Sequence, residues 1–210
     1  MRIGAYSLAV VLSYLIGSLP TGYLAGKARR IDIRAAGSGN IGATNVFRVL
    51  GKAAGISVLL VDGIKGFAAA RWVPLLVLQF FAGESRENLA LAAGAGAVLG
   101  HVYTCWLKFQ GGKGIATSAG VGLAWAPAAC ATTLGIWGIV FIRTRYVSVA
   151  SIVAAVVLPI AVWCFGGGPT MTCVMTAMAV LVIYKHKANI RRLLAGTENR
   201  AGTAKSQPSP

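Results

Sequence analysis

Residues 5–26 read AYSLAVVLSYLIGSLPTGYLAG, an uncharged run that is followed directly by Lys27, Arg29 and Arg30. A helix that crosses a bilayer needs about 20 mainly apolar residues, and this run has that length. Arg2 is the only charged side chain before it, whereas a cleavable signal peptide carries its charges in front and ends in a small-residue cleavage site. The run therefore predicts a retained membrane helix with its N-terminus outside.

The composition of the whole chain also indicates a membrane protein. Of 210 residues, 56% are hydrophobic and 12% are charged, whereas soluble domains carry about 25% charged residues. The 20 Lys and Arg outnumber the five Asp and Glu, but they gather in short gaps between apolar runs. This excludes a soluble nucleic-acid binder, which needs a solvated basic face. A transmembrane barrel would show short alternating segments, so we predict an all-α polytopic membrane protein.

The later apolar runs cover residues 53–82, 89–107, 115–142, 147–165 and 170–184. The run 115–142 is too long for one comfortable crossing and carries Pro127 near its middle. We expect two short helices hinged near Trp125-Ala126-Pro127, because irregular backbone is tolerated at depth where protein buries it. The alternative is one long tilted helix, which would place Arg143 and Arg145 outside.

Positive charge orients the chain, because cytoplasmic loops carry an excess of Lys and Arg. The segments 27–52, 108–114, 143–146 and 185–210 together hold 16 of the 20 basic residues. Placing all four on the cytoplasmic side predicts about seven transmembrane or half-membrane helices, with the N-terminus outside and the C-terminus cytoplasmic. We expect one integral-membrane domain over residues 1–198 and a disordered cytoplasmic tail over residues 199–210, which is rich in Ser, Gln, Pro and Gly.

The loop after the first run is rich in small residues and donors. Its sequence is Gly37-Ser38-Gly39-Asn40-Ile41-Gly42-Ala43-Thr44-Asn45, and Arg48 follows. Small residues let successive backbone N–H groups converge on an anion. The side chains of Ser38, Asn40, Thr44 and Asn45 add donors, and Arg48 adds a bidentate cation. The alternative is a flexible linker, but linkers are rarely this rich in Asn and Thr, so we expect a phosphate-binding loop.

A second loop, Phe109-Gln110-Gly111-Gly112-Lys113-Gly114, surrounds one lysine with glycines at the expected start of a helix. The dipole of a helix favours anions at that end. The alternative is a lysine that reaches lipid headgroups. Two such loops on one side of the membrane favour phosphate binding.

Further polar residues lie on the same side. Ser148 and Ser151 follow a basic gap, and if residues 185–195 are helical, His186 and Asn189 share a face. Asp62 and Lys65 lie one turn apart at membrane depth, where we expect them to neutralise each other or line a cavity.

Several catalytic patterns are absent from the sequence. Neither His101 nor His186 is followed by an aspartate at the fifth position, and no G-x-S-x-G motif or His/Cys cluster occurs. No pair of carboxylates is available for acid–base chemistry. We therefore expect no metal or other cofactor, and a substrate that is already activated.

These motifs, in this order, resemble the bacterial acyl-phosphate:glycerol-3-phosphate acyltransferases, the PlsY family, over roughly residues 5–198. Thr104 departs from the pattern, because the family more usually has a proline after its Gly-His, here Gly100-His101. The resemblance implies transfer of a fatty acyl group from acyl phosphate to the 1-hydroxyl of glycerol 3-phosphate. The products would be 1-acylglycerol 3-phosphate (lysophosphatidic acid) and phosphate, in the first committed step of bacterial phospholipid synthesis.

The resemblance also implies roles and a location. Acyl phosphate would bind at Ser38, Gly39, Asn40 and Gly42. Glycerol 3-phosphate would bind at Arg48, Lys113, Ser151, His186 and Asn189, of which Lys113, Ser151 and His186 would be catalytic. Asp62, Lys65 and Glu198 would be structural, with Glu198 tying the tail to a cytoplasmic arginine. The protein would span the bacterial plasma (inner) membrane several times, with its site facing the cytoplasm and an enzyme that makes acyl phosphate as a partner.

Two other classes fit parts of the sequence. A transporter for a phosphorylated anion would also have glycine-broken helices that face an anion, but we see no inverted repeat and the anion loops lie on one side. A membrane scaffold without a site would leave both glycine-rich loops unexplained.

Overall fold

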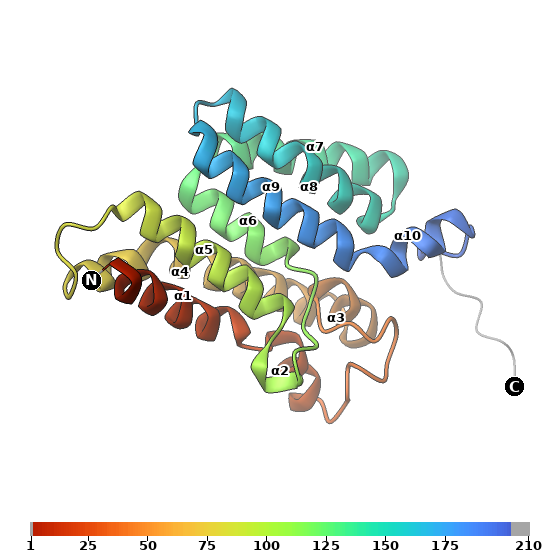
Figure 1. Cartoon of the computed structure of the whole chain (residues 1–210). Coiled ribbons are helices and arrows are strands. Elements are labelled where there is room, and N and C mark those ends of the chain that lie inside the picture. Colours follow the sequence, from red (N-terminus) through yellow and green to blue (C-terminus); the bar gives the residue numbers. More distant parts are fainter. Residues whose placement is uncertain (1, 203–210) are drawn as a thin grey trace, which may run out of the picture.

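The computed structural model describes residues 2–202, and in this range the secondary structure is entirely helical. Six helical spans in the range are long and apolar enough to cross a membrane, and residues 115–125 form a shorter apolar helix. This confirms the prediction of about seven transmembrane or half-membrane helices (Figure 1). The elements are α1 (Arg2–Ser18), α2 (Thr21–Ala28), α3 (Ala43–Leu50), α4 (Lys52–Leu78), α5 (Arg86–Val102), η1 (Cys105–Leu107), α6 (Ile115–Trp125), α7 (Pro127–Thr144), α8 (Val147–Cys164), α9 (Gly168–Lys185) and α10 (Lys187–Leu194).

The sequence suggests that the first apolar run is one continuous helix. In the structure the run breaks at Pro20, between α1 and α2. Proline has no N–H to continue the helical ladder, and where a helix ends its last carbonyls have no intrahelical partners. Two distant side chains replace them: the Thr104 hydroxyl donates to the Ser18 carbonyl at 2.5 Å, and the Lys65 ammonium donates to the Leu19 carbonyl at 2.8 Å.

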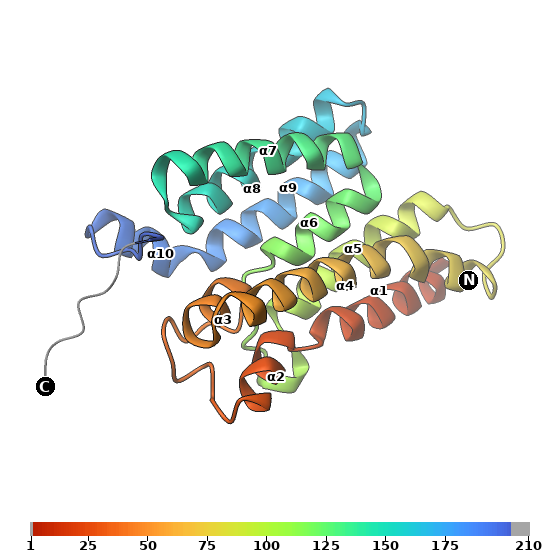
Figure 2. The ribbon, with the colours of Figure 1, turned by 180° about the vertical axis from the view of Figure 1, so that it is seen from behind.

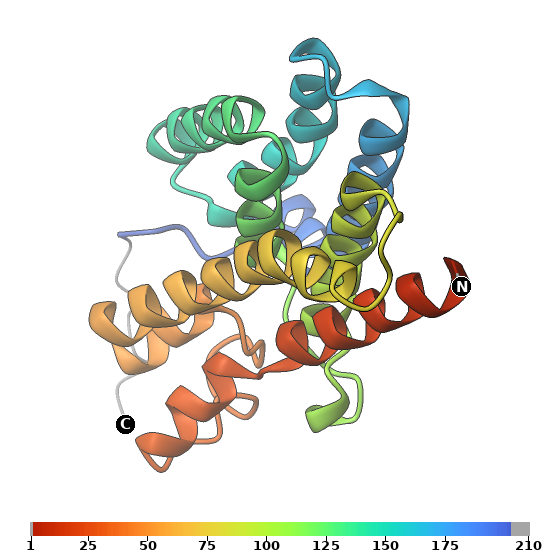
Figure 3. The same ribbon diagram turned by 90° about the vertical axis from the view of Figure 1, so that its left-hand side faces the viewer.

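The run 115–142 is two helices, as predicted. α6 ends at Trp125 and α7 begins with Pro127 in its first turn, a position where the missing N–H costs nothing. α6 packs against α4 at very short range, since a Cβ on Gly120 would lie 1.9 Å from the Gly63 carbonyl oxygen. Small residues permit such close approach of membrane helices. Seen along the bundle, α6 lies near its middle (Figure 3).

The basic segments meet at one end of the bundle, which we call the basic end. The segments 27–52, 108–114, 143–146 and 185–202 lie there with α2, α3 and α10, while the N-terminus and the turns 79–85 and 165–167 lie at the opposite end (Figures 1 and 2). Residues 185–195 do not form one continuous helix, because α9 ends at Lys185, α10 begins at Lys187, and His186 lies between them. The Ala201 N–H donates to the Arg145 carbonyl at 2.8 Å, and residues 203–210 of the expected tail lie outside the described range.

Candidate active site

A chain of hydrogen bonds joins the glycine-rich loop before α6 to α10 and to the segment after it. The Lys113 ammonium donates to Oδ1 of Asn189, and Nδ2 of Asn189 donates to Oε1 of Glu198 at 2.6 Å. Nε of Arg192 donates to Oε2 of the same carboxylate at 2.7 Å. Arg48, on α3, lies within electrostatic range of Glu198, Arg192 and Lys113. We call these five residues the cationic cluster, because three cations share a single carboxylate.

The protonation of the cluster follows from its packing. Burial lowers the pKa of Lys113 to about 8, and the charges of Arg192 and Arg48 act in the same direction while Glu198 opposes them. Burial alone would raise the pKa of Glu198, but hydrogen bonds from Asn189 and Arg192 hold it below its usual range. At neutral pH the cluster is therefore net positive, with Lys113 still mainly protonated, and suits an anion such as phosphate.

His186 lies in the break between α9 and α10, is 2% exposed, and places Nδ1 2.8 Å from the Val182 carbonyl oxygen. A carbonyl only accepts hydrogen bonds, so Nδ1 carries the proton and Nε2 keeps its lone pair. Burial lowers the pKa of His186 to about 4, and the positive charge of Lys113 adds to this effect. His186 is therefore neutral at physiological pH, and Nε2 is able to accept a hydrogen bond or a proton.

Ser151 lies on α8, is 2% exposed, and its hydroxyl oxygen accepts a hydrogen bond from Nε1 of Trp137 at 3.3 Å. Trp137 belongs to α7, so the hydroxyl is held by the neighbouring helix. The tryptophan lies within an apolar run, and nothing in the sequence singles it out.

The first glycine loop is more self-contained than the sequence suggests. The N–H of Ser38 donates to Oδ1 of Asn45 at 2.8 Å, that of Gly39 to the Ala36 carbonyl at 3.0 Å, and that of Gly42 to Oδ1 of Asn40 at 2.8 Å. The Asn45 amide also donates to two loop carbonyls and is buried. These three N–H groups and Asn45 therefore hold the loop together, and our expectation that they converge on an anion was wrong. Ser38 and Thr44, whose hydroxyls are donors, are exposed on this loop.

The two glycine loops nevertheless share a cavity of about 310 Å³, which we call the interloop cavity. Its lining comes from both loops and from the end of α9, namely Arg34, Gly39, Ile41, Phe109, Gln110, Gly111 and Lys185. Arg34 is paired with Asp32 at 2.7 Å, whereas the Lys185 ammonium lies 4.8 Å from the centre of the Tyr103 ring. Lys185 thus brings a positive charge to the cavity that no sequence motif assigned.

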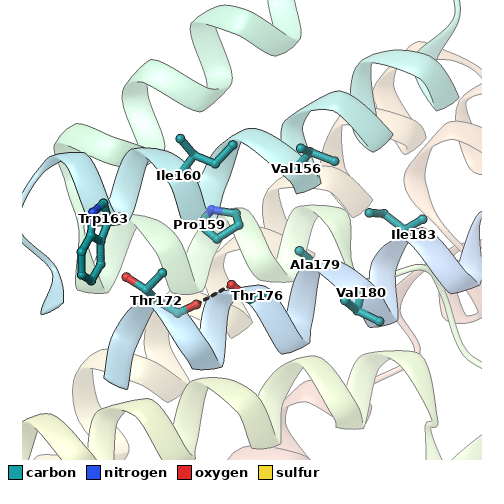
Figure 4. A pocket seen from close by; sticks show the side chains of 9 residues that line it. All are labelled: Val156, Pro159, Ile160, Trp163, Thr172, Thr176, Ala179, Val180 and Ile183. Carbon is teal, nitrogen blue, oxygen red and sulfur yellow. Dashed lines mark hydrogen bonds between the residues drawn. The ribbon is translucent and has the colours of Figure 1, made fainter. Parts of the chain in front are cut away.

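A second cavity, of about 480 Å³, lies between α8 and α9 and is lined almost entirely by apolar side chains (Figure 4). Val156 and Ile183 lie at one end of this apolar cavity, and Trp163 and Thr172 lie at the other. Ile183 precedes His186 by three residues, which is about 4.5 Å along a helix. A surface of this kind holds hydrocarbon and not phosphate.

The remaining polar pair at membrane depth is Asp62 and Lys65, 2% and 5% exposed, whose side chains lie 2.7 Å apart on α4. They neutralise each other, as expected. Among residues 2–202, no three His, Cys, Asp or Glu side chains lie together as a metal site requires.

The fold and the candidate site together define an integral membrane protein with a net positive cluster of side chains at one end of a helical bundle. Residues 7–196 match the family model described as glycerol-3-phosphate acyltransferase. The chain belongs to this family. It is 44% identical over 193 residues to the glycerol-3-phosphate acyltransferase of Geobacter sulfurreducens, covering 92% of this chain and 96% of that one, and 46% identical over 197 residues to that of Desulforudis audaxviator, covering 93% and 96%.

Solved structures show the same likeness. The chain superimposes with a TM-score of 0.85 on a crystal structure of PlsY, an integral membrane glycerol 3-phosphate acyltransferase, in its glycerol 3-phosphate form. The identity is 37%, over 94% of this chain and 96% of that one. The lysophosphatidic acid form of PlsY gives a TM-score of 0.83.

Proposed function

We propose that this glycerol-3-phosphate acyltransferase takes its acyl group from acyl phosphate and attaches it to the 1-hydroxyl of glycerol 3-phosphate. The new ester bond forms at the acyl carbon while the anhydride bond to phosphate breaks, so the products are lysophosphatidic acid and inorganic phosphate. The observation that carries the proposal is the cationic cluster, a net positive site beside a neutral histidine. Acyl phosphate is already activated, so no nucleophilic side chain is required.

Glycerol 3-phosphate binds at the cationic cluster and at the groups beside it. Arg48 and Lys113 contact its phosphate, since charged hydrogen bonds to phosphate are the strongest available. Asn189 holds Lys113 in place, and the Ser151 hydroxyl, fixed by Trp137, orients the glycerol part. The catalytic contribution is largely positional, because holding two reactants together lowers a barrier by about 7–11 kcal/mol.

Acyl phosphate binds at the loop segment that holds Ser38, Gly39, Asn40 and Gly42. Of these, Gly39 lines the interloop cavity, and Lys185 brings its charge to the same cavity. Because the N–H groups of Ser38, Gly39 and Gly42 hold the loop, the Ser38 hydroxyl and the Asn40 side chain make the contacts. The fatty acyl chain extends along the apolar cavity between α8 and α9, whose near end lies about one turn from His186.

The hydroxyl proton of glycerol 3-phosphate has two acceptors in this arrangement. One is a phosphate oxygen of a substrate, and the other is the Nε2 lone pair of neutral His186. His186→Gln separates them: an amide at this position still donates hydrogen bonds but does not accept a proton, so a large loss of kcat with little change in either KM supports His186.

The basic end faces the cytoplasm of a bacterium, where glycerol 3-phosphate is soluble, and the protein spans the plasma (inner) membrane. An enzyme that produces acyl phosphate supplies the donor.

The test is incubation of the purified protein with glycerol 3-phosphate and one of three donors: acyl phosphate, acyl-CoA or an acyl carrier protein thioester. We expect lysophosphatidic acid from acyl phosphate alone, because the sequence lacks the His/Asp pair that would deprotonate the acceptor for a thioester. Comparable rates with acyl-CoA contradict the proposal. Counterflow of labelled glycerol 3-phosphate in proteoliposomes, without acyl transfer, would favour a transporter.

A further inference from the structure

Three buried polar side chains, Asp62, Lys65 and His101, lie close together, and only Asp62 and Lys65 form an ion pair at hydrogen-bond distance. Asp62 and Lys65 pair on α4, and Oδ1 of Asp62 also accepts a hydrogen bond from the Thr21 hydroxyl at 2.5 Å. The third side chain is His101, near the end of α5, which is 5% exposed. Its Nδ1 lies 3.6 Å from Oδ1 of Asp62 and has no hydrogen-bond partner within residues 2–202.

The other edge of the His101 ring touches the loop that carries Lys113. A Cβ built on Gly112 would lie 2.1 Å from Nε2 of His101 and 2.8 Å from Cε1, and all three of its nearest atoms belong to this ring. The loop is also fixed by its backbone, since the Gly112 N–H donates to the His101 carbonyl and the Gly111 N–H to the Val102 carbonyl, both at 3.1 Å. His101 therefore lies directly beneath the loop, between Asp62 and Gly112.

We propose that His101 is a positioning residue for Lys113. Its ring fills the space under Gly112, between the loop and Asp62. The ring thereby sets the position of the loop that carries Lys113. In this position the Lys113 ammonium reaches Asn189 and the substrate phosphate. The inference rests on the proposed role of Lys113 in binding glycerol 3-phosphate.

The contact between Gly112 and the imidazole permits a test by compensation. Gly112→Ala adds a methyl group that collides with the ring, and we expect the KM for glycerol 3-phosphate to rise about tenfold or more, because overpacking displaces the loop. His101→Ala removes the support and raises the same KM by a smaller factor. In the double variant the methyl group occupies part of the space that the ring vacated, so its KM should lie below that of Gly112→Ala alone.

Gly111→Ala is the matched control. Its Cβ would lie 2.0 Å from the backbone oxygen of His101, which remains when the side chain is removed. His101→Ala should therefore not rescue Gly111→Ala. In the variants at Gly112 and His101 the KM for acyl phosphate should stay close to that of the wild type. A general loss of folded protein would lower the apparent kcat without raising the KM for either substrate. Gly111 lines the interloop cavity, so Gly111→Ala is compared by the KM for glycerol 3-phosphate alone.

The proposal is overturned if the two effects multiply in the double variant, or if His101→Ala leaves the KM for glycerol 3-phosphate unchanged. If Gly112→Ala does not fold, the two variants are compared by thermal stability in detergent, and the double variant should be more stable than Gly112→Ala. If His101→Ala is unstable, His101→Asn takes its place. Lys113→Ala in the wild-type background distinguishes a failure of the proposed role of Lys113 from a failure of the proposed role of His101. If it leaves this KM unchanged, the proposed function of Lys113 is wrong, whereas a raised KM without compensation refutes only the role of His101.

Discussion

The Lys113 ammonium donates a hydrogen bond to the side-chain oxygen of Asn189, across 76 residues of sequence. The bond joins the glycine-rich loop at the start of α6 to α10, an eight-residue helix at the basic end. Asn189 in turn donates to Glu198, so the position of one cation depends on two elements distant in sequence.

Deprotonation of Lys113 should weaken binding of glycerol 3-phosphate at alkaline pH. Its pKa is lowered to about 8 by burial and by the neighbouring cations, so the charge is present below this pH and lost above it. The KM for glycerol 3-phosphate should rise through pH 8 in initial-rate measurements between pH 7 and pH 10. Lys113→Arg should shift this rise to higher pH, because a guanidinium stays protonated. An unchanged alkaline limb in Lys113→Arg would show that another group titrates.

Arg48→Lys should impair glycerol 3-phosphate binding although it keeps the charge. Lysine lacks the planar fork that binds two phosphate oxygens, and the loss of a charged hydrogen bond costs about 1.5–3 kcal/mol. This corresponds to roughly a ten- to hundredfold fall in kcat/KM. Arg143→Lys, at an exposed position on α7, is the control. Wild-type kinetics in Arg48→Lys would remove Arg48 from the site.

Gly39→Ala should act on the acyl-phosphate half of the reaction. Gly39 has φ +71° and a Cβ there would lie 3.0 Å from the Arg34 carbonyl oxygen. The left-handed conformation costs a residue with Cβ about 1–2 kcal/mol, so we expect roughly a five- to thirtyfold lower kcat/KM for acyl phosphate. Gly166→Ala has a similar φ of +78° with no atoms within 4 Å at the opposite end, and should leave both substrates unaffected. An equal effect of the two variants would contradict a specific role for Gly39.

Filling the apolar cavity should shorten the preferred acyl chain. Thr176 is exposed and lines the cavity (Figure 4), so Thr176→Phe displaces part of a chain bound there. Each methylene that loses contact costs about 0.8 kcal/mol, so two methylenes change the ratio of long-chain to short-chain kcat/KM roughly tenfold. Thr132→Phe on α7 is a matched control, since its hydroxyl makes the same bond to the carbonyl four residues earlier. The same selectivity in both variants and the wild type would place the acyl chain elsewhere.

Labelling of single cysteines tests which side of the membrane the basic end faces. We expect single cysteines at Ser38, Gln110 and Arg143, in a background without the four native cysteines, to resist an impermeant thiol reagent applied from the periplasm. A cysteine at Ser85, in the turn at the opposite end, should react. Labelling of the first three from outside would reverse the orientation.

The sequence alone determines the membrane class and most of the helices, because apolar length and charge are local properties of a chain. Pro127 within an overlong run predicts the hinge between α6 and α7, and the basic gaps predict which segments share one end of the bundle. The glycines, Arg48 and Lys113 mark parts of the candidate site for the same reason: their chemistry is visible one residue at a time.

Only the tertiary structure decides how these parts are held. Pro20 is visible in the sequence, but its break is stabilised by Thr104 and Lys65, which helix packing alone brings to it. Asn45 looks like a ligand donor and is instead committed to its own loop. The tautomer of His186 and the contact of His101 with Gly112 depend on single atoms of neighbouring turns. Hydrogen bonds and close contacts are decided over tenths of an ångström, and periodicity and composition contain no distances between residues far apart in the chain.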